Sequence, residues 1–265
     1  MQLTSLTIGQ FYPGTSLLHR VDPRTKIISS FAFVIVLFLA RGFVPLALLG
    51  AILLAGITFS GIPLIWLWRG LRPMLILLLI TFFFQLLFVG GEEVAHLGPI
   101  VFYREGLERG AFLVIRLVLL VLSGSLLTFT TPPVLLTDAF GRLISPLEKI
   151  KIPSYELALM MTIALRFIPT LLMELDRIIK AQRARGAGIG TGGPIRRARA
   201  VMPVLIPLFV MSFRHADELA LAMESRCYRG GRGRTMRRKL KYGWRDAAFM
   251  AVVAVVLFLS LLIGI

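Results

Sequence analysis

The chain has 265 residues, 57% of them hydrophobic, and a formal net charge of +16. A soluble domain has an apolar share of roughly 45–50% with glycine counted, so this composition indicates an integral membrane protein and excludes an ordinary soluble domain. The single cysteine, Cys227, excludes an intramolecular disulfide and a cysteine-based metal cluster.

Five apolar stretches have the character of membrane-spanning helices, since roughly 20 apolar residues cross a bilayer core. They cover residues 27–40, 43–60, 73–89, 111–131 and 247–265. Basic residues precede the first stretch and separate the second from the third, which places both short loops on the cytoplasmic side. The connection 90–110 is acidic and is expected outside. The predicted fold class is therefore an all-α, polytopic membrane protein.

The positive charge is concentrated between the fourth and fifth spans. Residues 132–246 hold 21 Lys+Arg and 9 Asp+Glu, a net +12 of the total +16. An excess of this kind in one connecting segment is typical of the positive-inside bias of membrane proteins. No aromatic stacking platform accompanies the arginines, so we expect no nucleic-acid partner. Membrane lipid is the expected surrounding.

Two further apolar stretches, 155–175 and 201–213, lie inside this basic segment. Arg166 and three prolines interrupt them, and the second is too short to cross a bilayer. We interpret them as two long cytoplasmic helices, one N-capped by Ser154 and one with Pro194 in its first turn. The chain then divides into a membrane region 1–131, a cytoplasmic coupling region 132–246 and a final span 247–265.

Each long helix is expected to end in a short arginine motif. The first motif is Ala184-Arg185-Gly186, and the second is Ser225-Arg226-Cys227, 41 positions later. Asp and Ala also repeat at fixed spacing before each arginine, at 176 and 181 and again at 217 and 222. One arginine alone would be an ordinary helix C-terminal residue, stabilised by about 0.3–1 kcal/mol. The repetition favours two similar arms that contact two similar partners.

The sequence around these motifs resembles a known family. The segments Lys-Ala-Gln-Arg-Ala-Arg-Gly and Ala-Met-Glu-Ser-Arg-Cys-Tyr-Arg-Gly, the run Pro-Gly-Thr-Ser-Leu-Leu-His-Arg-Val-Asp-Pro-Arg-Thr-Lys at 13–26 and the Gly-Arg-Thr at 233–235 occur in order. Together they are similar to the transmembrane T component (EcfT/CbiQ-like) of energy-coupling factor (ECF) transporters, which are ABC-type importers. The second motif departs from the family's frequent Ala-Arg-Gly at its two outer positions.

The resemblance implies a role and a set of partners. In that family the two arginine motifs end coupling helices that dock onto two ABC-type ATPase subunits, and a hydrophobic face holds a separate substrate-binding membrane (S) component. This chain would then be a non-catalytic cell-membrane subunit that couples ATP-driven motion to uptake of a vitamin or a transition-metal ion. No cofactor is expected in the chain, because ATP would be bound by the partner ATPases.

The glycine-rich stretch 186–193 does not indicate an ATP site. It lacks the Gly-Lys-Ser/Thr ending of a phosphate-binding loop, so a linker is the better interpretation. His19 and Asp22 could suggest a metal site, yet a polar cap on the first span fits Asp22-Pro23 better. Arg116, near the outer end of the fourth span, is expected to extend its side chain toward the headgroups.

An alternative from another class is a membrane-embedded enzyme that acts on lipid or isoprenoid substrates. It would need a carboxylate-rich or histidine-rich cluster at the membrane face. Asp138, Glu148 and Glu156 do not form such a cluster at a recognisable spacing. The coupling interpretation is therefore preferred.

Overall fold

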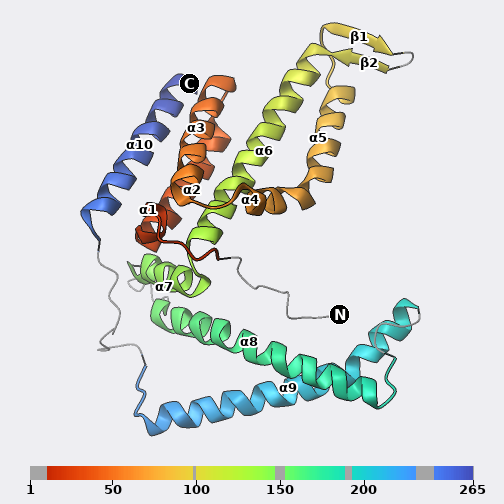
Figure 1. Ribbon diagram of the computed structural model, residues 1–265, viewed down its shortest axis with the longest axis vertical. Coiled ribbons are helices and arrows are strands. Elements are labelled where there is room, and N and C mark those ends of the chain that lie inside the picture. The colour runs from red at the N-terminus through yellow and green to blue at the C-terminus, as the bar shows by residue number, and fades with distance from the viewer. Residues whose placement is uncertain (1–10, 98–99, 147–152, 189–192, 231–241, 265) are drawn as a thin grey trace. The chain divides into compact units, whose positions relative to one another are not determined.

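The computed structural model describes residues 11–97, 100–146, 153–188, 193–230 and 242–264. Its elements (Figure 1) are α1 (Leu17–Arg20), α2 (Pro23–Leu39), α3 (Phe43–Ser60), α4 (Leu64–Leu71), the short 3-10 helix η2 (Arg72–Met74), α5 (Leu75–Phe88), β1 (Glu93–Leu97), β2 (Ile100–Tyr103), α6 (Arg104–Thr130), α7 (Pro133–Ile144), α8 (Ser154–Ala184), α9 (Pro194–Ser225) and α10 (Trp244–Gly264). The chain forms two compact units. The bundle unit is 9–140 with 238–265, and the arm unit is 141–237 with 1–8.

The predicted class, a polytopic helical membrane protein, is confirmed. Within the described residues, six helical segments are long and apolar enough to cross a membrane. They cover 43–60, 64–88, 104–130, 155–184, 199–225 and 244–263. The first expected span corresponds to α2, whose 17 residues extend about 25 Å.

Three local features differ from the sequence expectation. The loop predicted before the third span is helical, because α4 and η2 run directly into α5. The outer connection contains a small antiparallel hairpin, in which His96 pairs with Val101. The prolines do not break the long helices, since Pro169 lies inside α8 and both Pro203 and Pro207 lie inside α9. Proline removes one backbone donor, and a helix held by many other hydrogen bonds can continue through it.

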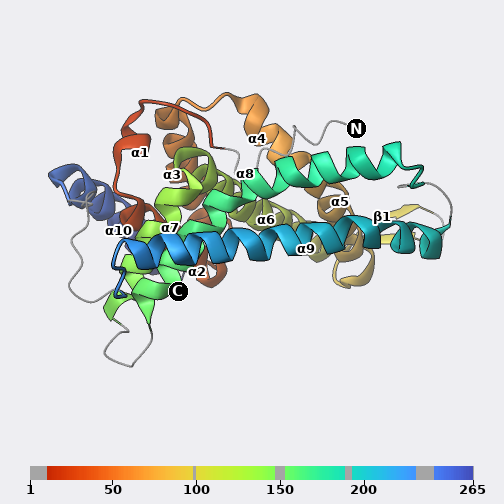
Figure 2. The ribbon, with the colours of Figure 1, turned by 90° about the horizontal axis from the view of Figure 1, so that it is seen from below.

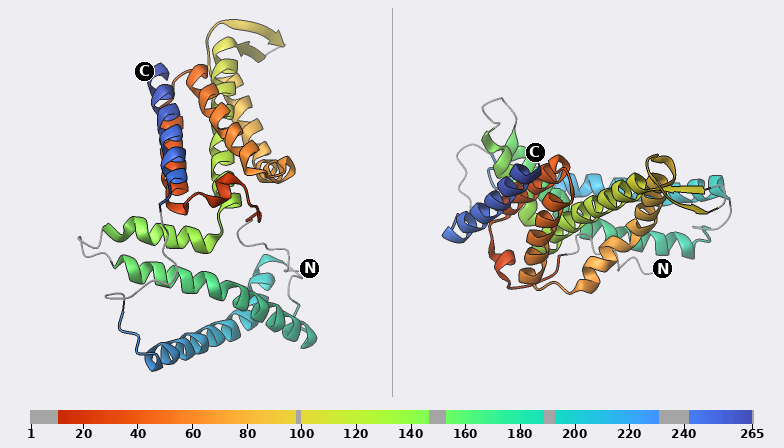
Figure 3. Two further views of the ribbon diagram at one scale, coloured as in Figure 1. Left: turned by 60° about the vertical axis from the view of Figure 1, so that its left-hand side comes forward. Right: turned by 90° about the horizontal axis from the view of Figure 1, so that it is seen from above.

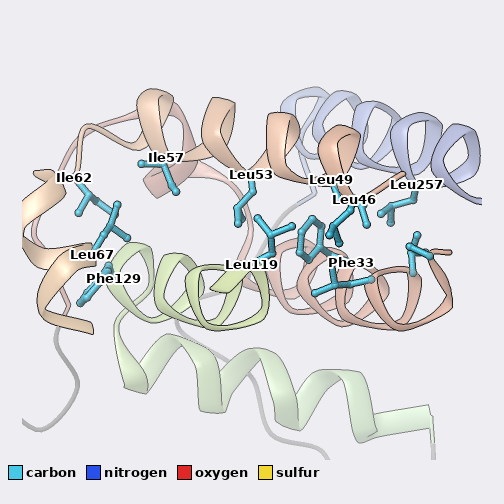
Figure 4. Packing of buried hydrophobic residues seen from close by; sticks show 13 residues of the cluster. Phe33, Leu46, Leu49, Leu53, Ile57, Ile62, Leu67, Leu119, Phe129 and Leu257 are labelled. Atoms are coloured by element: carbon cyan, nitrogen blue, oxygen red, sulfur yellow. The ribbon is translucent and has the colours of Figure 1, made fainter. Parts of the chain in front are cut away.

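The core of the bundle unit lies between α2, α3, α6 and α10, which run alongside one another, and α4, which lies across them (Figure 3). Leu37 of α2 and Leu49 of α3 are fully buried, and Leu119 of α6 and Leu257 of α10 pack in the same cluster (Figure 4). On the outer side of α2, Phe31 is 69% exposed. Helices that are apolar on every face suit a surrounding of lipid, because their outer side chains need no polar solvent.

A polar cluster joins the first and last long helices of the bundle unit. Asp22 is the N-cap of α2 and accepts a hydrogen bond from the Arg24 amide at 2.9 Å, as the predicted polar cap requires. The Asp22 amide donates to Oδ1 of Asp246 in α10 at 2.7 Å, and the Gly243 amide donates to Oδ2 of the same carboxylate at 2.8 Å. Asp246 is buried and holds both segments at one point.

A buried cation, Lys26, joins α2 to the end of α6. Its side chain is buried, and Nζ donates to the carbonyl oxygen of Thr130 and to Oγ1 of Thr131, both at 3.0 Å. An ammonium group removed from water needs such acceptors, because an unpaired buried charge is costly. Lys26 therefore fixes the start of α2 against the end of α6.

Helices α5 and α6 approach closely where α6 has two glycines one turn apart. A Cβ atom at Gly106 would lie 2.8 Å from the backbone oxygen of Gln85, and one at Gly110 would lie 3.2 Å from Cδ2 of Phe82. Small residues four apart allow helix backbones to pack closely in membranes. This contact fixes α5, whose remaining faces carry exposed apolar side chains.

The close approach predicts that Gly106→Ala destabilises the bundle unit by about 1–3 kcal/mol, because the added methyl group meets backbone that cannot yield. The matched control is Gly124→Ala on the same helix, where a Cβ meets nothing within 4 Å. This control should be neutral or stabilising by up to about 1 kcal/mol. Thermal unfolding of the detergent-purified variants measures both, and equal midpoints would contradict the prediction.

Candidate functional site: two arginine-capped helices

The arm unit consists mainly of α8 and α9, which pack against each other and run in opposite directions (Figures 1 and 2). The expected helix ends agree with the structure, since α8 begins at Ser154 and α9 begins at Pro194. Ser154 is the first helical residue, with Pro153 in the N-cap position that we expected Ser154 to occupy. Both helices end directly before the arginine of a motif.

The end of α8 is closed by a Schellman motif. Arg185 is the C-cap, and Gly186 adopts the left-handed conformation with φ of 82°. The Gly186 amide donates to the carbonyl of Arg183 at 3.0 Å, and the Ala187 amide donates to the carbonyl of Gln182 at 2.9 Å. These two bonds satisfy carbonyl groups that a helix end leaves unpaired.

The end of α9 repeats this geometry bond for bond. Arg226 is the C-cap, the Cys227 amide donates to the carbonyl of Glu224 at 2.8 Å, and the Tyr228 amide donates to the carbonyl of Met223 at 3.0 Å. Each of these residues lies 41 positions after its counterpart on α8. The sequence repeat is therefore a repeat of structure, and it extends beyond each arginine into the turn that follows.

The two motifs differ where the sequence departs from the family pattern. Cys227 has φ of 56° and is the one described non-glycine residue with positive φ. A side chain in this region costs about 1–2 kcal/mol relative to glycine, because Cβ approaches the following carbonyl oxygen. Ser225, in place of alanine, donates its hydroxyl to the carbonyl of Ala222 at 3.1 Å and leaves the helix end unchanged.

Both arginine side chains are available to a partner. Arg185 and Arg226 are exposed, and neither has a hydrogen bond or ion pair to another residue in the described part of the chain. Ala184 and Ser225, which precede them, are exposed as well. The cation at each tip is favourably placed near the negative end of the helix dipole.

A side-chain pair that the sequence reasoning missed joins α8 to α9. Nε2 of His215 lies 2.6 Å from Oε1 of Glu174, and the His215 ring lies 6.0 Å from the ring of Phe167, centroid to centroid. The two residues are 41 positions apart, the spacing of the arginine motifs. That offset is the signal that could have identified them, had it been followed back along both helices.

The other polar residues considered from sequence have structural roles. The two ring nitrogens of His19 contact Oγ of Ser16 at 2.7 Å and the carbonyl oxygen of Tyr12 at 3.0 Å. Arg116 has a hydrogen-bond acceptor inside the bundle unit. Its Nη2 donates to the carbonyl of Ala40, the C-cap of α2, at 2.6 Å.

No group of three or more potential metal-ligating side chains occurs among the residues that the structure describes. Of the carboxylates weighed for an enzyme site, Asp138 lies in α7 and Glu156 in α8. Glu148 lies outside the described residues, as do Gly-Arg-Thr at 233–235 and residues 189–192 of the glycine-rich stretch.

The apolar bundle and the paired arginine-capped helices define a polytopic helical membrane protein with two long helices that each end at an exposed arginine. The profile of the CbiQ family, described as "Cobalt transport protein", matches residues 14–236, and the chain belongs to this family. Similar proteins named "Energy-coupling factor transporter transmembrane protein EcfT" occur in Thermosediminibacter oceani, with 47% identity over 94% of both chains, and in Acidaminococcus fermentans, with 48% identity over 98% of this chain and 96% of the relative. The relative from Bacillus subtilis is 44% identical over 98% of both chains.

These matches confirm the resemblance to the transmembrane component of ECF transporters, and they extend it over nearly the whole chain. They also confirm the assignment to a membrane transport system.

The geometry of the two helix ends predicts opposite effects of two matched substitutions on the stability of the last helical turn. Cys227→Gly should relieve strain and stabilise the last turn of α9 by about 1 kcal/mol, whereas Gly186→Ala should introduce strain and destabilise the last turn of α8 by about 1–2 kcal/mol. Neighbouring atoms do not interfere at Gly186, since a Cβ there meets nothing within 4 Å. Hydrogen exchange of peptides that contain Tyr228 or Ala187 measures both changes. Slower exchange in both variants, or in neither, would contradict the assignment of these turns.

Proposed function

We propose that this chain is the coupling subunit of an ECF-type importer. It transmits the ATP-driven motion of two ATPase subunits to a substrate-binding membrane subunit. The observation that carries the proposal is the pair of arginine-capped helix ends with the same hydrogen bonds 41 residues apart. Two copies of one attachment geometry suit two similar partner surfaces, as a pair of homologous ATPases provides.

The chemistry of the tips supports docking. A guanidinium group presents its donors in a fixed plane and can bond a carboxylate or several carbonyl oxygens of a partner groove. Both tips are held by hydrogen-bonded turns, so little conformational entropy is lost when a partner binds. Lysine carries the charge without the planar fork and should substitute poorly at Arg185 and Arg226.

Charge supports a cytoplasmic position for α8 and α9, where ATPases operate. Both helices are long and apolar enough to span. However, Arg166 and Arg177 of α8 and Arg214 and Asp217 of α9 are exposed. In a lone spanning helix, exposed charges near the middle would face hydrocarbon, which is costly. The net charge of the segment 132–246 points the same way.

The substrate-binding subunit requires an apolar surface, and α5 offers one. Phe83, Phe84 and Phe88 are each more than half exposed. On α9, Met202 and Phe209 are exposed beside prolines. Flexible methionine and aromatic surfaces can accommodate more than one partner. The cargo would be a vitamin or a transition-metal ion recognised by that subunit, and ATP would be bound and hydrolysed by the ATPases, with no cofactor in this chain.

Replacing both tip arginines tests the docking role. Arg185→Ala with Arg226→Ala should abolish retention of the ATPases, because each buried arginine anchor contributes about 2 kcal/mol or more, roughly 30-fold in affinity. The measurement is mild-detergent affinity purification of the tagged chain from its host, with mass spectrometry of the bound proteins and titration of the recovered ATPases.

Arg183→Ala is the matched control, because Arg183 is exposed two positions before the first tip and belongs to neither motif. It should retain the ATPases at the native level. A double variant that binds them as the native chain does, while inserting normally into the membrane, would refute the proposal.

Cysteine labelling tests the position of the arm unit. In a Cys227→Gly background, Met173→Cys near the middle of α8, where the native side chain is 57% exposed, should react with a membrane-impermeant maleimide only in inverted vesicles. The exposed Glu92→Cys should react only from outside. If position 173 is protected from both sides until detergent is added, α8 crosses the membrane and the cytoplasmic position is wrong.

A further inference from the structure

The contact between α8 and α9 joins equivalent positions of the two arms. Glu174 precedes Arg185 by 11 positions, and His215 precedes Arg226 by the same number, since both pairs are separated by 41 positions. In Figure 1 the ribbons of the two helices cross. The helices have 31 and 32 residues, and this partly buried polar contact joins two positions that are equivalent in the 41-residue repeat.

Contact between equivalent residues has a geometric meaning. When two antiparallel helices are related by a local two-fold axis, a residue touches its own counterpart only near that axis. Glu174 and His215 mark the place on α8 and α9 where such an axis would pass. The helix from this point to each arginine is 11 residues long, about 16 Å at 1.5 Å per residue. The two arms have equal reach.

The chemistry of the contact suits a joint between two helices. The Glu174 side chain is 12% exposed and that of His215 is 26% exposed, so their 2.6 Å bond is shielded from water. Oε2 of Glu174 is buried without a hydrogen-bond partner among the described residues. A carboxylate with a second free oxygen can keep the bond to the ring while the crossing angle changes, because either oxygen can accept.

Apolar neighbours support the same point. The Phe167 ring packs against His215, with planes tilted by 43°. A second carboxylate, Glu218, lies one turn further along α9 with Oε2 at 3.7 Å from Nδ1 of His215, and its side chain is 75% exposed. The ring is thus oriented from both helices, while Glu174 provides the bond that joins them.

We propose that Glu174 and His215 form the pivot of the two arms, as positioning residues that hold the two arginine tips at matched reach so that both engage the ATPase pair together. The inference rests on the proposed docking of Arg185 and Arg226. Its physical effect is one of effective concentration: once one tip is bound, a fixed pivot presents the second tip at the required separation, and the second contact becomes intramolecular.

The test is a cycle of variants in the full chain, titrated with the ATPase subunits recovered from the native complex. Glu174→Ala should weaken binding by about tenfold when both tips are present, because the second tip is no longer presented at a fixed distance. In the one-tip background Arg226→Ala, the same Glu174→Ala change should have no effect, since one contact needs no partner arm. General misfolding would weaken binding in both backgrounds.

Exchange of the pair is the decisive rescue. Because the two positions are equivalent in the 41-residue repeat, Glu174→His combined with His215→Glu should restore the bond and native binding. Each of those single changes alone should behave as Glu174→Ala does. Glu174→Gln keeps an oxygen that can accept a hydrogen bond from the His215 ring, and this variant should bind the ATPases near the native level. Such a result would show that the chain tolerates a substitution at position 174 without misfolding.

The outcomes separate this inference from the docking proposal. If Arg185→Ala and Arg226→Ala leave ATPase binding unchanged, the docking proposal is wrong and the pivot falls with it. If the arginine variants weaken ATPase binding, the docking proposal stands. The pivot is then refuted by any of three results: Glu174→Ala leaves binding unchanged, Glu174→Ala weakens binding equally in the one-tip background, or the exchanged pair fails to restore binding.

Discussion

The arrangement of the arm unit depends on one backbone constraint, the left-handed residue that follows each arginine. At Gly186 and Cys227 the chain turns so that two amides return to the last carbonyls of the helix. Without this turn, each helix would fray and its arginine would sample many directions. With it, Arg185 and Arg226 are both C-cap residues of long helices, presented to solvent in the same local frame. The direction of each arginine is therefore set by main-chain geometry.

In the bundle unit, apolar helices must stay together although the lipid around them is also apolar. Burial alone gives little preference in lipid, so specific contacts matter more. The close approach of Gly106 to the α5 backbone, the Asp22–Asp246 bond and the buried Lys26 are such contacts. Several apolar side chains of α5 remain exposed among the described residues, and that face suits lipid or another subunit.

Local rules predicted much of this structure. Apolar length identified the long helices of the bundle, Asp22-Pro23 identified the start of α2, and the position before Gly186 identified the end of α8. The roles of Lys26 and Arg116 were not predictable, because each depends on a partner 76 or more residues away in sequence that no local pattern reveals. The contact of Glu174 with His215 could have been found only by following the 41-residue repeat back along both helices. The expectation that prolines interrupt α8 and α9 was wrong for a related reason. The free-energy cost of one proline is local, and the many other contacts of a 31- or 32-residue helix can offset it.

The bond between Asp22 and Asp246 also constrains the order of events during synthesis. Asp22 enters the bilayer region with the first helices, whereas its carboxylate partner lies in α10, the last helix. The amide of Asp22 therefore has no acceptor at Asp246 until α10 has been made and has joined the other helices. Closure of α2 against α10 is consequently a late step, because it unites two segments that lie 224 residues apart in the sequence.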